Sequence, residues 1–211
     1  GRTGALVVVE VATGAVLAMA SAPSYHLETL TARGYAELAR DTETRPLVNR
    51  ALAAGYLPGS IIKPLIGLAA LEAGTVAPEA DTRTCKGAYT LGDTRIGCWH
   101  RRGHGELDLI HAVEQSCNVF FIDTGLATGL ERIAPMLVGA GLGRAPAIEL
   151  PAVGEGLVPT RAWALETWNR DWLAIDTAYL SIGQGAVALS PLQAALYAAA
   201  IANGGTVFRP Y

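Results

Sequence analysis

The chain has 211 residues, of which 51% are hydrophobic and 17% are charged, a balance typical of one globular domain with a substantial core. Its formal net charge is −3, which gives no basic surface for nucleic acid, so no nucleic-acid partner is expected. No apolar run is long enough to cross a membrane. Residues 5–22 favour a β-hairpin over a signal peptide, because Glu10 and a turn at residues 12–14 interrupt them.

The first predicted elements are the two strands of this hairpin, at residues 6–11 and 15–21. Both are nearly continuous apolar runs rich in valine and alanine, which predicts burial on both faces. Residues 22–45 follow. They are polar and predict an irregular or partly helical segment.

The stretch Leu57–Pro64 organises the rest of the chain. Its Pro-Gly turn runs into an apolar segment, Ile61–Leu71, which predicts a buried helix with Ser60 in the first turn. Ser60 and Lys63 are three residues apart, so a helix places both side chains on one face. A hydroxyl at the positive end of a helix, beside an amine that burial keeps neutral, is what a serine nucleophile needs. On its own, the pattern also fits a capping serine beside a lysine that reaches solvent.

Residues 75–106 form a long stretch without periodicity, which predicts a functional or cross-linked loop. Strands at the start of the chain and helices in its middle predict the α+β class. Three tryptophans are expected to pack or to line a groove: Trp163, Trp168 and Trp172. The remaining elements expected are helices at 108–115, 119–125 and 130–139, a loop at 151–160, a turn capped by Thr160, a glycine-flanked loop at 181–185, a helix at 190–202, and a strand or connector at 206–211.

A second motif, Ser116-Cys117-Asn118, lies 56 positions after Ser60 at a predicted break between helices. Such a Ser-x-Asn sequence can present a hydroxyl and a carboxamide from one side of the backbone, with Cys117 facing away. The hydroxyl can relay a proton between Lys63 and a leaving group, and the amide can hold a substrate carbonyl. On its own, this motif also fits a polar turn.

A third segment, Ser181-Ile182-Gly183-Gln184-Gly185, is followed by Ser190-Pro191-Leu192-Gln193 and an alanine-rich helix. In this order and at these spacings, the three segments resemble the transpeptidase domain of class B penicillin-binding proteins. The resemblance covers nearly the whole chain, and residues 181–205 are its most specific part. The stretch from Cys98-Trp99 to Gly103-His104-Gly105 resembles the elongation-type subgroup, which builds the lateral wall of rod-shaped Gram-negative bacteria.

The resemblance implies a penicillin-binding-protein/serine β-lactamase-like transpeptidase fold over residues 1–211. It implies that Ser60 is the nucleophile, that Lys63 is its base, and that Ser116 and Asn118 form the second catalytic motif. Ser60 would be acylated by the D-Ala-D-Ala end of a peptidoglycan stem peptide, and the acyl group would pass to an amine of a neighbouring strand. β-Lactam antibiotics would acylate the same serine.

The family's third motif, Lys-Ser/Thr-Gly on a sheet strand, does not occur in the 211 residues. We therefore expect an incomplete domain, truncated before the C-terminal sheet strands. The resemblance also implies a membrane glycosyltransferase partner of the elongation machinery and a location at the periplasmic face of the inner membrane. Two alternatives are a β-lactam hydrolase or sensor of the same superfamily and a non-catalytic domain that docks other wall-synthesis proteins.

The three cysteines and one of the four histidines follow the spacing C-x12-C-x5-H-x12-C. These residues are Cys85, Cys98, His104 and Cys117. Three thiolates and an imidazole make a closed tetrahedral zinc site, and some members of the elongation-type subgroup carry zinc at equivalent positions. A Cys85–Cys98 disulfide with Cys117 buried and free is the alternative. Two further histidines are alternative ligands: His100 and His111.

Overall fold

The computed structural model describes residues 3–211, apart from the side chain of Thr29, so the first two residues of the expected domain lie outside the described residues. Within these residues the chain forms two compact units. One comprises residues up to 56 together with 141–156 and 189–211, and the other comprises 57–140 and 157–188. Helices and strands occur together, which confirms the α+β prediction. The single transpeptidase domain expected over residues 1–211 stays a prediction.

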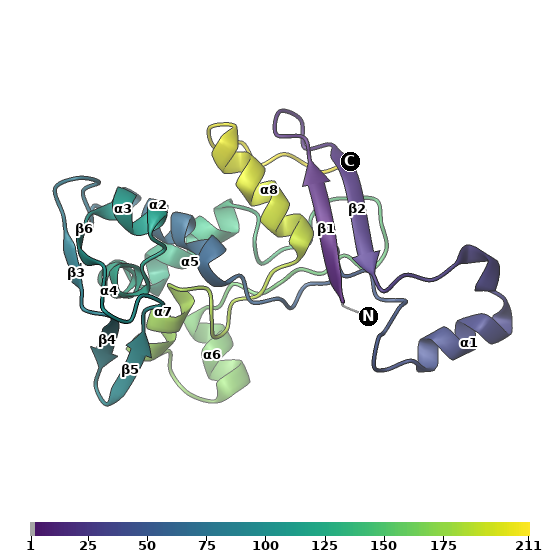
Figure 1. The fold of residues 1–211 in the computed structure, drawn as a ribbon, viewed down its shortest axis with the longest axis horizontal. Helices are drawn as coiled ribbons and strands as arrows, with labels where there is room; N and C mark the ends of the chain where they lie inside the picture. Colours follow the sequence, from purple (N-terminus) through teal and green to yellow (C-terminus); the bar gives the residue numbers. More distant parts are fainter. Residues whose placement is uncertain (1–2) are drawn as a thin grey trace. The chain divides into compact units, whose positions relative to one another are not determined.

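In the first unit the predicted hairpin forms, with β1 (Gly4–Val9) antiparallel to β2 (Val16–Ala22) (Figure 1). Helix α8 (Pro191–Ala202) packs along β1, as Figure 1 shows. Its start is capped by Ser190, whose hydroxyl accepts the N–H of Gln193. The core between them contains Leu52, Leu192 and Leu196, with Val7, Val9, Val16, Met19, Ile148 and Val153 packed around it.

The prediction that the hairpin is buried on both faces is wrong. Val7 and Val16 pack against the core of the unit, whereas Leu6 and Leu17 are 55% and 65% exposed. Side chains alternate between the two faces of a strand, and the described residues cover only one face of this hairpin. The continuous apolar runs in the sequence conceal that alternation.

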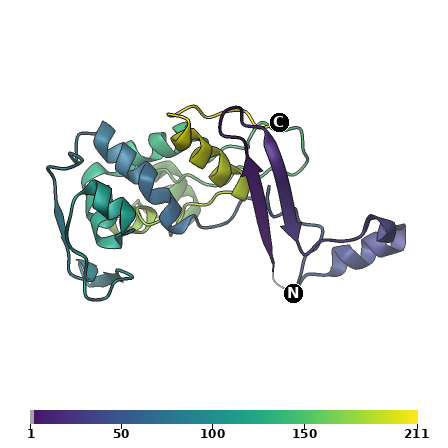
Figure 2. The same ribbon diagram turned by 45° about the horizontal axis from the view of Figure 1, so that its top comes forward.

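The polar segment after the hairpin is partly helical, as expected. It holds a 3-10 turn at Leu27–Thr29 and helix α1 (Ala32–Arg40), whose cap Thr31 accepts the N–H of Gly34. Figure 2 shows α1 at the end of an arm that leaves β2, and none of its described residues is buried.

In the second unit, α4 (Asn118–Thr128) contacts α2 (Lys63–Glu72), α5 (Leu130–Gly139) and α7 (Ala174–Leu180). Helix α4 is buried along much of its length because it is apolar around most of its circumference. The helices expected near residues 61–71, 108–115, 119–125 and 130–139 are confirmed. Two shorter helices complete the set in this unit: α3 (Leu109–Glu114), capped by Asp108, and α6 (Arg161–Trp168), capped by Thr160.

The stretch at 75–106, predicted to be a functional or cross-linked loop, contains regular structure. This stretch holds four short strands in two antiparallel pairs, β3 with β6 and β4 with β5. Their bounds are Arg83–Cys85, Gly105–Leu107, Ala88–Leu91 and Thr94–Gly97. Strands of three or four residues are too short to show an alternating pattern, so the sequence gives no periodic signal for them.

Helix α7 was also missed, because its seven residues precede the glycine-flanked loop without a strong start signal. The segment at 206–211 is a connector without regular structure. It ends beside β2, where the carbonyl of Tyr211 accepts the N–H of Val16 at 2.9 Å.

Candidate active site

Ser60 and Lys63 lie on consecutive short helical segments. A 3-10 turn at Gly59–Ile62 carries Ser60 and leads directly into α2, whose first residue is Lys63. Pro64 occupies the first turn of α2, where its missing N–H leaves no hydrogen bond unmade. The Ser60 side chain is exposed, and its hydroxyl makes no hydrogen bond to the described residues.

The amine of Lys63 is the centre of the site. The residue is 2% exposed, and its Nζ donates to the carbonyl of Ser116 at 2.7 Å, to the Ser116 hydroxyl at 3.1 Å and to Oδ1 of Asn118 at 2.7 Å. These three bonds use all three hydrogens of an ammonium group. Lys63, Ser116 and Asn118 therefore meet, although they come from segments more than fifty residues apart.

The backbone at Ser116 explains how the second motif reaches Lys63. Ser116 adopts a left-handed conformation with φ of 50°, between the end of α3 and the first residue of α4. That turn directs both the carbonyl and the hydroxyl of Ser116 toward the amine. Cys117 is fully buried and does not contact Lys63 through a hydrogen bond, in agreement with the expectation that its side chain faces away.

Burial lowers the pKa of Lys63 from 10.5 to about 8, while negative charge on Cys98 and Cys117 would oppose that shift. With a pKa near 8, roughly a tenth of the lysine is neutral at pH 7. A neutral amine has a lone pair that can accept a proton from a nearby hydroxyl. Lys63 therefore has the electrostatic setting of a general base.

Two residues next to Cys98 form hydrogen bonds at the second motif: Gly97, the last residue of β5, and Trp99. One amide hydrogen of Asn118 is donated to the carbonyl of Gly97 at 3.0 Å. Trp99, 62% exposed, donates its indole N–H to the carbonyl of Gln115 at 2.9 Å. Sequence reasoning assigned no role in the site to Trp99 or Gly97. Trp99 stood out only as part of the stretch that resembles the elongation-type subgroup, and Gly97 only as the residue before Cys98.

The predicted ligand set also converges. One ligand atom from each of Cys85, Cys98, His104 and Cys117 lies within 4.8 Å of all the others. The three cysteines are buried and free, so the alternative Cys85–Cys98 disulfide is not formed. The two other candidate histidines are engaged elsewhere: His100 with the carbonyl of Gly103, and His111 with Asp108.

The cluster has the composition and compactness of a metal site. Zinc–sulfur bonds of about 2.3 Å place tetrahedral sulfur ligands about 3.8 Å apart, so a small contraction suffices. The Cys98 sulfur already lies 3.6 Å from Nδ1 of His104. The other nitrogen of His104 is buried without a hydrogen-bond partner among the described residues.

The pKa values of the candidate ligands shift in different directions. Burial raises the pKa of the Cys117 thiol to about 12. Burial also acts to raise the pKa of Cys98, but hydrogen bonds from the backbone N–H groups of Asn118, His100 and Val119 outweigh it, and that pKa is lowered. Burial, then the charges of His100 and Lys63, lowers the pKa of His104, which keeps its imidazole neutral. A divalent cation would favour the thiolate form of all three cysteines.

The third predicted segment lies against the first. The N–H of Gly59 donates to the carbonyl of Gly183 at 2.9 Å, so the loop at 181–185 touches the turn that carries Ser60. The three sequence segments therefore lie in one region of the second unit.

Comparisons with known proteins agree with this geometry. Residues 4–211 match the family described as penicillin binding protein transpeptidase domain. The chain is 34% identical over 219 residues to the peptidoglycan D,D-transpeptidase MrdA of Salmonella typhimurium, covering 100% of the chain and 34% of that protein. The chain therefore spans about a third of the length of this curated relative.

Solved structures show the same fold. The crystal structure of Pseudomonas aeruginosa PBP2 in complex with WCK 5153 superimposes with a TM-score of 0.91 at 36% identity, covering 100% of the chain and 49% of that protein. A chain from a structure titled "Structural coordination of polymerization and crosslinking by a peptidoglycan synthase complex" superimposes with a TM-score of 0.86 at 36% identity, covering 96% of this chain and 35% of that chain.

Proposed function

The chain belongs to the family of penicillin-binding protein transpeptidase domains, with relatives of the elongation type, and from that membership we propose that it carries out serine D,D-transpeptidation. In this proposal it cross-links peptidoglycan stem peptides through an acyl-enzyme on Ser60, and β-lactams acylate the same residue. The observation that carries the proposal is the buried amine of Lys63, which lies 2.7 to 3.1 Å from oxygen atoms of Ser116 and Asn118. Lys63 follows the exposed Ser60 by three residues.

In the acylation step, the neutral amine of Lys63 takes the proton of the Ser60 hydroxyl as Oγ bonds to the carbonyl carbon of the penultimate D-alanine. The oxyanion develops at the positive end of α2 and its preceding turn. When the amide bond breaks, the leaving D-alanine amine takes a proton that passes from Lys63 through the Ser116 hydroxyl. Lys63 returns to its neutral form.

The second step reverses these proton movements. The amine of a neighbouring strand attacks the Ser60 ester and loses a proton toward Lys63, and the Ser60 oxygen leaves as a hydroxyl. The side-chain oxygen of Asn118 accepts a hydrogen bond from Lys63 and so positions the amine, while one amide hydrogen of Asn118 is donated to the carbonyl of Gly97. The second amide hydrogen is left for a substrate carbonyl, which is the role expected from the sequence.

The partners and location follow the same family. We infer a membrane glycosyltransferase partner of the elongation machinery, supported by the related structure of a peptidoglycan synthase complex. We infer action at the periplasmic face of the inner membrane, supported by the relative MrdA, which is named as a peptidoglycan D,D-transpeptidase. Within residues 3–211, no helix combines the length and apolar character needed to cross a bilayer.

We also infer that Cys85, Cys98, His104 and Cys117 bind one structural zinc ion. A set of three thiolates and one imidazole with no open position favours a structural site over a catalytic one. The metal would cross-link the end of β3, the residue that follows β5, the residue that precedes β6, and Cys117. It would take no part in the proton transfers.

Acylation by a fluorescent penicillin tests the proposed function in the natural full-length protein. We expect one covalent label per chain and an intact mass raised by one antibiotic molecule, with no label on Ser60→Ala. Ser24→Ala is the matched control, because Ser24 is an exposed serine outside the site. Absence of label on the unaltered protein would overturn the proposal, and rapid loss of the label would favour the β-lactam hydrolase.

A further inference from the structure

Three consecutive residues after α7 connect the two catalytic motifs. We call Ser181-Ile182-Gly183 the wedge. Gly183 touches Gly59, the neighbour of Ser60, while Ser181 touches Gly125 of α4, the helix that begins at Asn118. All of these residues belong to the second unit.

On one side, Gly183 allows direct contact between two backbones. Its φ is +73°, and its carbonyl accepts the N–H of Gly59 at 2.9 Å. A Cβ atom at position 183 would lie 2.0 Å from the oxygen and 2.5 Å from the nitrogen of Gly59. No side chain fits there unless the turn that carries Ser60 moves.

On the other side, Ser181 packs so closely against α4 that no side-chain atom fits at Gly125. A Cβ atom on Gly125 would lie 1.8 Å from the Ser181 hydroxyl oxygen and 2.7 Å from its Cβ. Ser181 is fully buried, and its hydroxyl donates to the carbonyl of Thr177 at 2.7 Å. Between the two contacts, Ile182 belongs to the same buried apolar cluster as Ile122 of α4.

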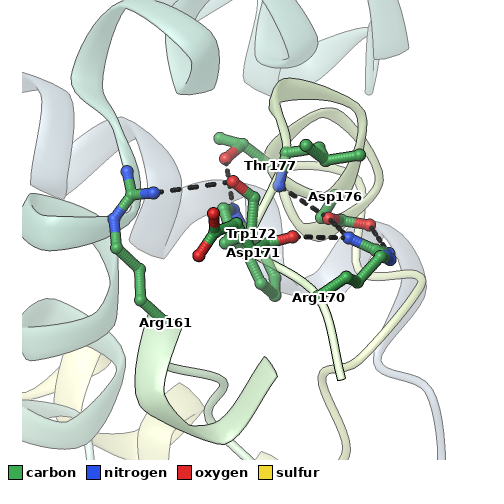
Figure 3. A network of polar contacts seen from close by, with 7 residues as sticks. Arg161, Arg170, Asp171, Trp172, Asp176 and Thr177 are labelled. Carbon is green, nitrogen blue, oxygen red and sulfur yellow. Dashed lines mark hydrogen bonds and ion pairs between the residues drawn. The ribbon is translucent and has the colours of Figure 1, made fainter. Parts of the chain in front are cut away.

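The start of α7 is fixed by a polar network (Figure 3). Arg170 donates to both carboxylate oxygens of Asp176, at 2.6 and 2.8 Å, and the N–H of Leu173 donates to the same carboxylate. The indole N–H of Trp172 donates to the Thr177 hydroxyl at 2.8 Å. Since Thr177 also accepts the bond from Ser181, the network holds both ends of α7 and so the wedge.

We propose that the wedge sets the separation between Ser60 and the second motif, Ser116 and Asn118, and that Gly183 and Gly125 are positioning residues for acylation. The inference rests on the proposed transpeptidase function. The contact at Gly183 fixes the turn that carries the nucleophile, and the contact at Gly125 fixes the helix that carries Asn118. A displacement of about 1 Å in such a site can cost about 100-fold in rate.

The first test compares Gly183→Ala with Gly185→Ala in the natural full-length protein. Gly185 has a nearly equal φ of +77°, but a Cβ there would meet its nearest neighbour, in Tyr179, at an ordinary 3.4 Å. Both variants therefore carry similar backbone strain, and only Gly183→Ala disturbs the Ser60 turn. The readouts are melting temperature, the maximal rate of fluorescent-penicillin acylation, and the antibiotic concentration at half-maximal rate.

For Gly183→Ala we expect a maximal acylation rate about 100-fold below that of Gly185→Ala, with the half-saturating concentration changed less than about threefold. Equal rates in the two variants would overturn the proposal. Acylation of the unaltered protein but not of Ser60→Ala establishes the proposed function separately, so failure of the wedge and failure of that function are distinguishable.

A rescue experiment covers the case in which Gly183→Ala does not fold. Gly125→Ala should lose acylation because its methyl group meets Ser181, and Ser181→Gly in the same chain should restore it by removing both atoms of the clash. Restored folding without restored acylation in the double variant would overturn the proposal. So would full acylation of Gly125→Ala alone.

Discussion

The amine nitrogen of Lys63 lies 2.7 Å from the carbonyl oxygen and 3.1 Å from the hydroxyl oxygen of Ser116. The two contacts differ in what they do. The carbonyl contact depends only on the left-handed turn at Ser116 and holds the amine in place. The hydroxyl contact offers a path for a proton. Removing the side chain of Ser116 therefore separates placement from proton transfer.

Ser116→Ala should keep Lys63 in place and slow acylation. The carbonyl of residue 116 and Oδ1 of Asn118 remain as acceptors, so we expect the free energy of unfolding to change by less than about 1 kcal/mol. Loss of the proton relay should lower the acylation rate by about 100- to 10,000-fold. Quenched time courses with fluorescent penicillin measure the acylation rate, and urea unfolding measures the free energy of unfolding. An unchanged rate would exclude the Ser116 relay.

The rate of acylation should depend on pH through Lys63. Burial lowers the pKa of this amine to about 8, and only its neutral form can accept the Ser60 proton. The rate should therefore rise about tenfold per pH unit below that value and level off above it. Acylation rates between pH 6 and 9.5 check this, with the melting temperature followed over the same range. A flat profile in protein that stays folded would show that Lys63 is not the base.

The sequence predicted the parts of the site that depend on spacing. Ser60 and Lys63 share one helical turn, and the prediction that Cys117 faces away from the catalytic motif agrees with its place in the buried cysteine–histidine cluster. The four predicted ligands also converge in the structure.

What the sequence did not predict depends on packing. Continuous apolar runs conceal which face of the β1–β2 hairpin is covered, so the exposure of Leu6 and Leu17 was missed. Strands β3 to β6 are too short for a periodic signal. The contact between Gly183 and Gly59 joins residues more than 120 positions apart, and only a folded chain shows it.

Zinc should contribute to the stability of the second unit. Elemental analysis of protein purified without chelator should give about one zinc per chain, and His104→Ala should reduce that content. His100→Ala is the matched control, because His100 stacks on His104 but bonds to the carbonyl of Gly103 outside the ligand set. Chelation should lower the melting temperature of the unaltered protein and leave His104→Ala nearly unchanged. Equal zinc content in all three proteins would exclude this ligand set.

The carboxylate of Asp176 should stabilise the fold at neutral pH and lose that effect in acid. Burial acts to raise its pKa, but hydrogen bonds from Arg170 and Leu173 outweigh it, so the folded-state pKa lies below the ordinary 3.8. A carboxyl with a lowered pKa adds stability above its unfolded pKa and loses it as pH falls through the folded value. Asp176→Asn should therefore cost about 1 kcal/mol of unfolding free energy at pH 7 and progressively less below pH 4. Asp171→Asn is the control, since only the backbone carbonyl of Asp171 accepts from Arg170. A constant difference between the Asp176 variant and the unaltered protein from pH 7 to pH 3 would contradict this account.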